Sequence, residues 1–251
     1  MQKIGIIGLG LIGGSIFKDL IDLEYEVKAV SRSQNGENIY KSYEDLKDCE
    51  IIFVCTPMNK TLKVLDELEN IISVNTVVCD VCSLKKFVSE KERPYIFIPS
   101  HPMAGTEHKG FENSFKGLFK GAKWVITRKA NGVEKLIEII KKLGAEPVFA
   151  TAAEHDEAAA MISHMPMVIA QALFLTASQN PLALEIASSG FRDMTRLALS
   201  NEEMANDMVT MNAENIQKAI LKLYKVIGDL TGSGYAEKIS EIKKNRAKIF
   251  V

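Results

Sequence analysis

The stretch KIGIIGLGLIGGS, residues 3–15, decides the fold of the first half of the chain. A short β-branched run leads into three glycines with the spacing Gly8-x-Gly10-x-x-Gly13, and an amphipathic helical pattern follows to about residue 23. In the dinucleotide-binding fingerprint the first glycine permits a tight turn, the second lets the backbone approach a pyrophosphate, and the third lets helix and strand pack closely. The pyrophosphate then lies at the helix N-terminus. We predict that five residues of this loop bind a dinucleotide, a purely structural turn being the alternative: Gly8, Gly10, Leu11, Ile12 and Gly13.

Short β-branched runs alternate with helical patterns through the first 150 residues. Strands are predicted at 3–7, 25–30, 51–55 and 76–81, with helices at 11–23 and 60–72. This alternation is typical of a parallel sheet with crossover helices, and we expect strands 95–98, 124–127 and 146–149 and a helix at 133–143 to continue it. The segment 35–42 is too short for a full crossover helix, so the adenine side of the groove is expected to be open.

The character of the sequence changes after Ala150. Thr151 and Glu154 form a Thr-x-x-Glu capping box, and the residues that follow are helical with no clear strand. We therefore predict an α/β Rossmann-type dinucleotide-binding domain at 1–150, followed by an all-α domain at 151–251 for substrate binding and dimerisation. A helical half of this size buries little surface alone, so we expect a homodimer.

The end of the second predicted strand bears on cofactor choice. Sites that prefer NAD usually place a carboxylate there for the ribose 2′-hydroxyl, but this strand ends in Ser31, Arg32 and Ser33. A guanidinium can pair with a 2′-phosphate, and hydroxyl groups can donate to it. We predict NADP as the cofactor, with NAD possible; a solvated arginine in a turn is the alternative.

Composition excludes several classes of partner. Lys and Arg number 31 against 32 Asp and Glu, a net charge of −1, so no broad basic surface for nucleic acid is expected. The most apolar later stretch, 161–177, is interrupted by polar residues and falls short of a membrane span. Four cysteines suit a reducing cytoplasm, and Cys79 and Cys82 are assigned to core packing rather than to a metal. The protein is expected to be soluble and cytoplasmic.

Two polar residues follow predicted strands and are candidates for chemistry. His101 comes after strand 95–98, and a histidine can accept a hydroxyl proton at neutral pH while hydride leaves the same carbon. Ser83 comes after strand 76–81 and could orient that imidazole or touch a nicotinamide. The alternatives are a structural histidine and a serine helix N-cap.

Six motifs in order carry a resemblance to a known family: GLGLIGGS (8–15), CTP (55–57), DVCSLK (80–85), HPMAGTE (101–107), SHMP (163–166) and SGFRDMTR (189–196). Together they resemble the prephenate/arogenate dehydrogenase (TyrA) family across nearly the whole chain. The resemblance implies NAD(P)-dependent oxidative decarboxylation of a cyclohexadiene acid on the route to tyrosine.

The resemblance also implies roles for individual residues. His101 is the catalytic base for the 4-hydroxyl proton, Ser83 hydrogen-bonds it and the substrate, and Arg196 pairs with the side-chain carboxylate. Thr56 and Pro57 lie at the cofactor. Four further residues are candidates for substrate binding. His164 lies either in contact with the substrate or behind it, and Asp193 is a carboxylate beside Arg196. Thr106 and Glu107 belong to the loop after His101, and Glu107 could gate the site.

One position departs from the family pattern. Met167 stands where many prephenate-using members have a second histidine. This difference, together with Ser31-Arg32 and the run ASSGFRD (187–193), resembles the NADP-linked arogenate branch, so prephenate and arogenate both remain candidate substrates.

Two other classes of protein compete with this interpretation. β-Hydroxyacid dehydrogenases carry a catalytic lysine early in the helical domain, and residues 151–200 contain none. A non-catalytic NADP-binding regulator would need the glycine loop but not His101, Ser83 and Arg196 together.

Overall fold

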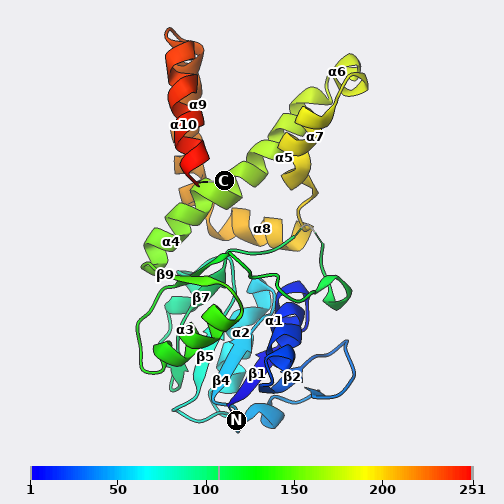
Figure 1. Ribbon diagram of the computed structural model, residues 1–251, viewed down its shortest axis with the longest axis vertical. Coiled ribbons are helices and arrows are strands. Elements are labelled where there is room, and N and C mark those ends of the chain that lie inside the picture. The colour runs from blue at the N-terminus through cyan, green and yellow to red at the C-terminus, as the bar shows by residue number, and fades with distance from the viewer. Residues whose placement is uncertain (1, 107, 250–251) are drawn as a thin grey trace.

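The computed structural model describes residues 2–106 and 108–249 and has two domains, one built on β-sheets and one entirely helical (Figure 1). The last strand ends at Phe149 and the first helix of the second domain begins at Ala152. The predicted fold class, a Rossmann-type domain followed by an all-α domain, is confirmed.

The main sheet is parallel, with strand order β3-β2-β1-β4-β5-β6. The strands are β1 (Lys3–Ile7), β2 (Glu26–Val30), β3 (Ile39–Tyr40), β4 (Ile51–Val54), β5 (Val77–Asp80) and β6 (Ile96–Phe97). Apolar clusters cover both faces of this sheet, as the continuous β-branched runs require. The helices of this domain are α1 (Leu11–Asp22), α2 (Met58–Leu68) and α3 (Val133–Lys142).

The connection from β2 to β3 has no helix. It is a short loop, and the two-residue strand β3 pairs in parallel with Ala29 and Val30. A single 3₁₀ turn, Tyr43–Leu46, then leads to β4. The short segment expected from the sequence is therefore present.

A second sheet corrects one expectation. Residues near 124–127 and 146–149 do not extend the parallel sheet; β7 (Ser100–Pro102), β8 (Lys123–Ile126) and β9 (Glu146–Phe149) form a sheet of their own, in which β7 and β8 are antiparallel. Pro99 has no N–H to donate, so the ladder of β6 stops there, while its carbonyl accepts from the Thr127 amide at 3.0 Å. The β-branched pattern predicts strands but not which sheet they join.

Aromatic packing joins the two sheets. The Trp124 ring of β8 is fully buried and lies 6.2 Å from the Phe53 ring of β4 and 5.2 Å from the Phe119 ring, between centroids. The second sheet is therefore part of the first domain's core.

The helical domain begins with one long rod and ends in a helical hairpin. The rod comprises α4 (Ala152–Ala159), a π-helical turn (Ala160–His164) and α5 (Met165–Ala177). The helices that follow are α6 (Pro181–Glu185), α7 (Ser189–Thr195), α8 (Glu202–Met211), α9 (Ala213–Thr231) and α10 (Tyr235–Ile249).

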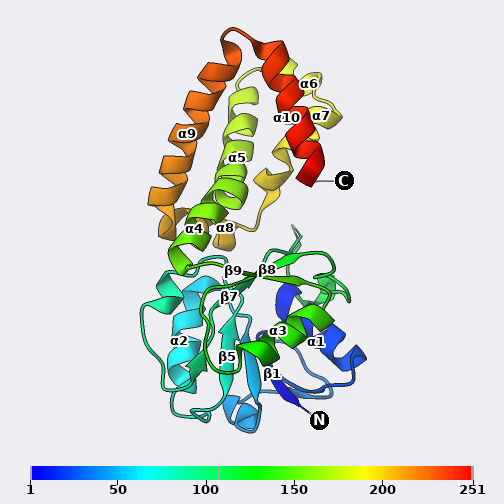
Figure 2. The ribbon, with the colours of Figure 1, turned by 60° about the vertical axis from the view of Figure 1, so that its left-hand side comes forward.

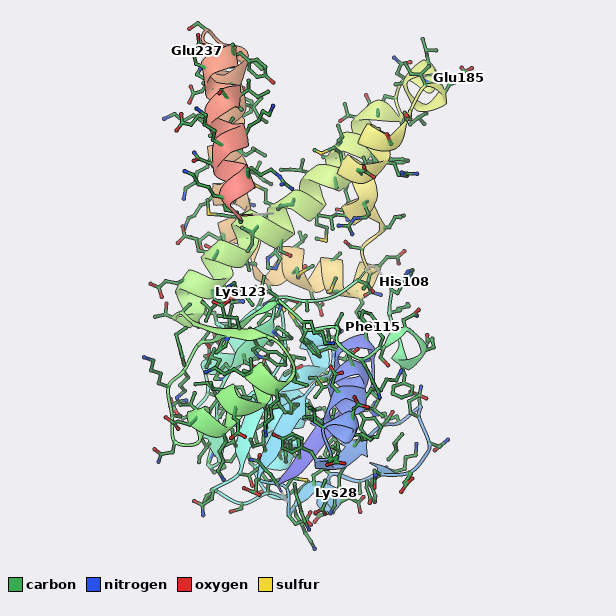
Figure 3. The ribbon with its side chains drawn as sticks, viewed as in Figure 1. Lys28, His108, Phe115, Lys123, Glu185 and Glu237 are labelled. Atoms are coloured by element: carbon green, nitrogen blue, oxygen red, sulfur yellow. The ribbon has the colours of Figure 1, made fainter. Side chains whose placement is uncertain are left out.

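The helices of this domain form two diverging arms (Figure 1). One arm contains α5, α6 and α7, and the other contains α9 and α10; in the turned view the two arms overlap above the first domain (Figure 2). Glu185 and Glu237 mark the tips of the two arms (Figure 3). Large apolar side chains of both arms, among them Leu175, Leu221 and Tyr224, are exposed in the single chain.

The rod also differs from expectation in its apolar length. Within the described residues, the continuous helix Ala152–Ala177 is long and apolar enough to cross a membrane by length and composition, whereas residues 161–177 alone were expected to fall short. The reason is that α4 continues through the π turn into α5 without a break. Only 28% of its most apolar window is buried within the chain, so much of this apolar surface faces outward.

Candidate active site

Three strand ends share one edge of the main sheet. Ile7 of β1 is aligned with Val54 of β4, and Val54 is aligned with Asp80 of β5. The glycine loop, Thr56-Pro57 and the segment containing Ser83 follow these strand ends. Because ligands of open α/β sheets bind beyond the carboxyl ends of the strands, this edge is the candidate cofactor site.

The three fingerprint glycines are constrained in different ways. Gly8 has a φ of +94°, which favours glycine, and a Cβ on Gly13 would lie 2.0 Å from the Gly8 carbonyl oxygen. A Cβ on Gly10 would meet nothing within 4 Å. Gly10 also precedes α1, whose N-terminus has no side-chain cap. The open backbone and the uncapped amides fit the phosphates of a dinucleotide.

The other predicted residues of the loop face the protein. Leu11 is buried, and Ile12 packs against the main core, so both would offer a ligand only their backbone.

The end of β2 presents a cationic side chain. Ser31 is buried and its hydroxyl accepts from the Gln34 amide at 3.1 Å, whereas Arg32 and Ser33 are exposed. The Arg32 side chain hydrogen-bonds Tyr43, although burial raises the pKa of that phenol. Arg32 is thus exposed at the end of β2 and bonded to Tyr43.

A buried ion pair anchors the strand that carries His101. Lys85 and Asp80 pair with both side chains fully buried, and the Lys85 ammonium donates to the Ser100 carbonyl at 2.7 Å. Asp80 Oδ1 accepts from the Ser100 amide at 3.2 Å. Trp124 Nε1 donates to the Ser100 hydroxyl at 3.0 Å, and that hydroxyl donates to the Asp80 carbonyl at 2.8 Å. These bonds fix β7 beside the end of β5.

His101 meets the helical domain. Its Nδ1 lies 2.9 Å from Nε2 of His155, and Nδ1 of His155 lies 2.7 Å from Oδ1 of Asp156. The Asp156 carboxylate also accepts the backbone amides of Lys85 at 2.8 Å and Lys86 at 2.9 Å. A row of three polar side chains therefore crosses the junction between the domains.

The environment keeps His101 neutral and Asp156 ionised. Burial lowers the pKa of His101 well below its usual value, and neighbouring His155, Lys85 and His164 lower it further. Burial opposes ionisation of Asp156, but the bonds from His155 and the two backbone amides outweigh it, so the pKa of Asp156 is lowered. A neutral imidazole linked through His155 to a fixed carboxylate suits proton abstraction.

Ser83 is half-buried and comes just after β5. The N-cap alternative for this serine is wrong, because the next helical turn, Phe87–Ser89, begins after Lys86 and no helix begins at residue 84. The nitrogen partner of His101 in the structure is His155 rather than Ser83.

His164 lies in the π turn and is almost fully buried. The Asn212 amide donates to its Nδ1 at 3.1 Å and to the Asp156 carbonyl at 2.9 Å. Burial lowers the pKa of His164 to about 4, against the favourable influence of Asp156. A π turn often marks a functional position in a helix, and this one places a neutral histidine near His101.

Other predicted substrate residues lie on the surface of the single chain. Arg196 is exposed at the end of α7, Asp193 forms an exposed ion pair with Arg192 at 3.7 Å, and Thr106 is exposed with its hydroxyl accepting from the His108 amide. Glu107 lies outside the described residues. The structure does not bring Arg196, Asp193 or Thr106 into the His101 row.

The remaining assignments concern packing. Met167 is 2% exposed and packs in a cluster with Met58, Cys82 and Leu84. Burial raises the pKa of the Cys82 thiol to about 12, and Cys79 is buried in the main core, as the packing interpretation requires. No group of three potential metal ligands occurs within residues 2–106 and 108–249.

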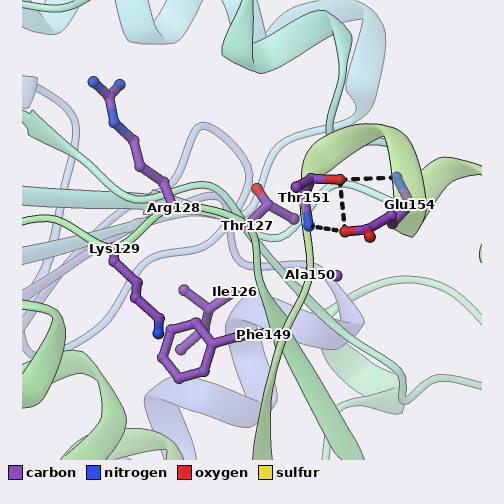
Figure 4. Close-up of a pocket in the computed structure, with 8 residues that line it drawn as sticks. All are labelled: Ile126, Thr127, Arg128, Lys129, Phe149, Ala150, Thr151 and Glu154. Atoms are coloured by element: carbon purple, nitrogen blue, oxygen red, sulfur yellow. Dashed lines mark hydrogen bonds between the residues drawn. The ribbon is translucent and has the colours of Figure 1, made fainter.

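A cavity of about 260 Å³ lies elsewhere, at the junction of β8, β9 and α4 (Figure 4). Its lining includes Lys129, Phe149 and the capping box of Thr151 and Glu154, whose hydrogen bonds the figure shows. It contains none of the predicted site residues, so it is not the candidate active site.

Sequence reasoning missed His155 and Asp156. The signal was present, because this ionisable pair falls in the first turns of a helix otherwise rich in alanine and directly follows the capping-box glutamate. Both side chains are buried, which is unusual for polar groups unless they are paired.

Comparisons with known proteins agree with this arrangement. Residues 20–149 match the family described as prephenate dehydrogenase, nucleotide-binding domain, and residues 151–233 match prephenate dehydrogenase, dimerization domain. A prephenate dehydrogenase of Lactococcus lactis is 30% identical over 85% of this chain and 66% of its own length. A cyclohexadienyl dehydrogenase of Zymomonas mobilis is 27% identical over 98% of this chain and 95% of its own length.

A solved structure is similar over the whole chain. The arogenate dehydrogenase of Synechocystis superposes with a TM-score of 0.83 at 29% identity, covering 99% of this chain and 100% of that one. The chain thus spans slightly less than two thirds of the Lactococcus protein but nearly all of the other two. Since the nucleotide-binding match alone covers more than half of the 251 residues and the dimerization match follows it in order, the chain belongs to the prephenate dehydrogenase family.

Proposed function

We propose that this chain is a cytoplasmic, NADP-linked dehydrogenase that oxidises and decarboxylates prephenate or arogenate. The observation that carries the proposal is the neutral His101 imidazole, fixed on β7 by the Asp80–Lys85–Ser100 bonds and placed where the nucleotide-binding domain meets the helical domain.

In this reaction the protein positions the substrate against the cofactor and accepts one proton. When bound, the nicotinamide accepts the hydride from C4 of the substrate. His101 takes the proton of the 4-hydroxyl group as the C–H bond breaks. The bond from C1 to its carboxylate then breaks to release carbon dioxide, its electron pair enters the ring, and the phenolate oxygen takes up one proton. The aromatic ring so formed drives the reaction.

The remaining residues are proposed to bind. Ser83 bonds the substrate hydroxyl from the end of β5, and His164 lies behind or beside the ring. Arg196 pairs with the side-chain carboxylate, with Asp193, Thr106 and Glu107 near it. Because these groups lie apart from His101 in the single chain, we propose that substrate binding, partner contact or both complete the site.

The cofactor assignment rests on the loop after β2. Arg32 is exposed, held by Tyr43, and stands where a carboxylate would select NAD. Gly8, Gly10 and Gly13, with the amides of Leu11 and Ile12, would receive the pyrophosphate. Ser31 and Ser33 flank the 2′-phosphate position, and Thr56 and Pro57 border the nicotinamide side.

The choice of substrate turns on the side chain that prephenate and arogenate carry, a keto group or an amino group. Met167 is buried and apolar where a second histidine is expected for prephenate. The similar Synechocystis structure is an arogenate dehydrogenase, which supports arogenate as the preferred substrate.

Turnover with both acids tests the proposal. Purified protein is given prephenate or arogenate with NADP⁺ or NAD⁺, reduced cofactor is followed at 340 nm, and the product is identified as hydroxyphenylpyruvate or tyrosine. We expect release of carbon dioxide and tyrosine formation, mainly with NADP⁺. Nucleotide binding without turnover of either acid would instead support a non-catalytic regulator.

We further propose a homodimer formed through the helical domain. The dimerization-domain match covers residues 151–233, and large apolar side chains there are more than half exposed in the single chain: Ile162, Leu175, Leu221 and Tyr224. Light scattering should give the mass of two chains. A double Leu221→Glu and Tyr224→Glu variant, altered at positions one turn apart on α9, should dissociate, and a monomeric wild type would contradict the proposal.

A further inference from the structure

In the row His101, His155 and Asp156, the donor and the acceptor of each hydrogen bond can be assigned by starting from Asp156. The Asp156 carboxylate is contacted by the backbone amides of Lys85 and Lys86 and by the ring of His155. An ionised carboxylate can only accept, so Nδ1 of His155 must carry the hydrogen in that bond.

The tautomer of His155 then determines the tautomer of His101. In its neutral form His155 has one ring hydrogen, and that hydrogen is on Nδ1, so its Nε2 is an acceptor. The contact of 2.9 Å from His155 Nε2 to His101 Nδ1 is a hydrogen bond only if His101 Nδ1 is the donor. A neutral His101 therefore has its hydrogen on Nδ1 and a free lone pair on Nε2 that can accept a proton.

We propose that His155 and Asp156 are positioning residues that hold His101 in the tautomer able to accept a proton through Nε2. This inference rests on the proposed function, since it explains how His101 becomes a base for the substrate hydroxyl. It also assigns a purpose to a buried ionisable pair that the binding of cofactor and substrate leaves unused.

The same row supports the charge that appears during the reaction. When Nε2 takes the hydroxyl proton, His101 becomes an imidazolium at a half-buried position, where an unpaired charge is costly. His155 continues to accept from Nδ1, and the Asp156 carboxylate lies at the other side of His155. The ring orientation is also fixed, since the His101 and His155 planes meet at 75° with centroids 5.1 Å apart.

An imidazole in water prefers its hydrogen on Nε2, so the proposed tautomer is a distinguishable state. The chain has four histidines, which makes ¹⁵N labelling of histidine and long-range ¹H–¹⁵N correlation spectra simple to assign by single replacement. The measurement uses the full-length protein at pH 7.5, with NADP⁺ present and no substrate, so it does not depend on turnover.

Two replacements of His155 separate positioning from packing. In His155→Gln the carboxamide can still accept from His101 and donate to Asp156, whereas His155→Leu fills similar space with neither group. We expect the Nδ1–H tautomer of His101 in the wild type and in His155→Gln, and the Nε2–H tautomer in His155→Leu. The kcat of His155→Leu should fall by about 10²-fold or more, within the range that a general base contributes, while that of His155→Gln falls less and the Kd for NADP⁺ is unchanged in both.

The outcomes are separable. An Nε2–H tautomer of His101 in the wild type would overturn the proposal by itself, even if His155→Leu did not fold. An unchanged tautomer and unchanged kcat in His155→Leu would also overturn it. A wild type that turns over neither acid would refute the proposed function, and the wild-type spectrum would still decide the tautomer.

Discussion

Lys85 and Asp80 form an ion pair in which both side chains are fully buried, and this pair ties the end of β5 to β7. The two residues are five positions apart in the sequence. Both hydrogen-bond the backbone of Ser100, the neighbour of His101. The position of His101, the proposed base, therefore depends on an interaction within the first domain.

Removing one partner of this pair should be costly. Lys85→Met leaves the Asp80 carboxylate buried without its cation, and we expect a loss of about 3–5 kcal/mol in the free energy of unfolding. Urea denaturation measures it. The matched control is Lys91→Met, which removes an exposed lysine paired with Asp66 and Glu69 and should change stability little. Equal, small effects of the two replacements would contradict the role given to Lys85.

Alanine replacements of two fingerprint glycines should have different effects, one on stability and the other on cofactor binding. Gly13→Ala places a Cβ against the Gly8 carbonyl, so α1 must move away from β1 and the free energy of unfolding should fall by about 1–3 kcal/mol. Gly10→Ala has space for its Cβ and should fold normally but bind NADP⁺ more weakly, because the methyl group would stand where we propose that the pyrophosphate approaches. Denaturation and calorimetric titration of both variants would separate these effects, and tight NADP⁺ binding by Gly10→Ala would contradict the cofactor site.

Arg32→Ala should change cofactor choice. Loss of the charge-assisted bonds to a 2′-phosphate should lower kcat/KM for NADP⁺ by about 10- to 100-fold and leave that for NAD⁺ nearly unchanged. Arg128→Ala is the control, since Arg128 is exposed and paired with Glu92 at 2.8 Å, away from the glycine loop. An equal loss of kcat/KM with both cofactors would show that Arg32 does not bind the 2′-phosphate.

As the proposed base, His101 should set the acid side of the pH–activity profile through its pKa. The base must be neutral to accept a proton, and burial together with the nearby His155, Lys85 and His164 lowers its pKa well below 6.5. We expect kcat/KM to stay level as pH falls from 8 to 6.5 and to decline only at lower pH. A decline already centred near 7 would mean that His101 is not in the environment described.

The pKa of His164 is also lowered, and this makes the stability of the folded chain depend on pH. Above pH 6.5 His164 is neutral in both folded and unfolded chains; below it the unfolded chain takes up a proton that the native His164, with a pKa of about 4, refuses. The free energy of unfolding should fall by at most about 3 kcal/mol from this group between pH 6.5 and 4. Urea denaturation at pH 7 and 5 should show a shallower loss in His164→Leu, and an equal loss would contradict the assignment.

The sequence predicts much of this fold because the relevant signals are local. The strand–glycine–helix order of residues 3–23, the missing crossover helix at 35–42 and the capping box of Thr151 and Glu154 each depend on neighbours in the chain. Local signals do not reveal sheet membership, so the pairing of β7 with β8 was not predicted. Nor do they reveal which helix face meets the sheet, so the contact between His101 and His155, 54 residues apart, needed the structure.

The measurement that tests the central claim most directly compares His101→Asn with the wild type under saturating NADP⁺ and arogenate or prephenate. Asparagine retains hydrogen-bonding capacity but cannot act as the base. The account predicts that kcat falls by about 10²- to 10⁴-fold while the Kd for NADP⁺ is unchanged. A variant that keeps the wild-type kcat would contradict the assignment of His101 as the base.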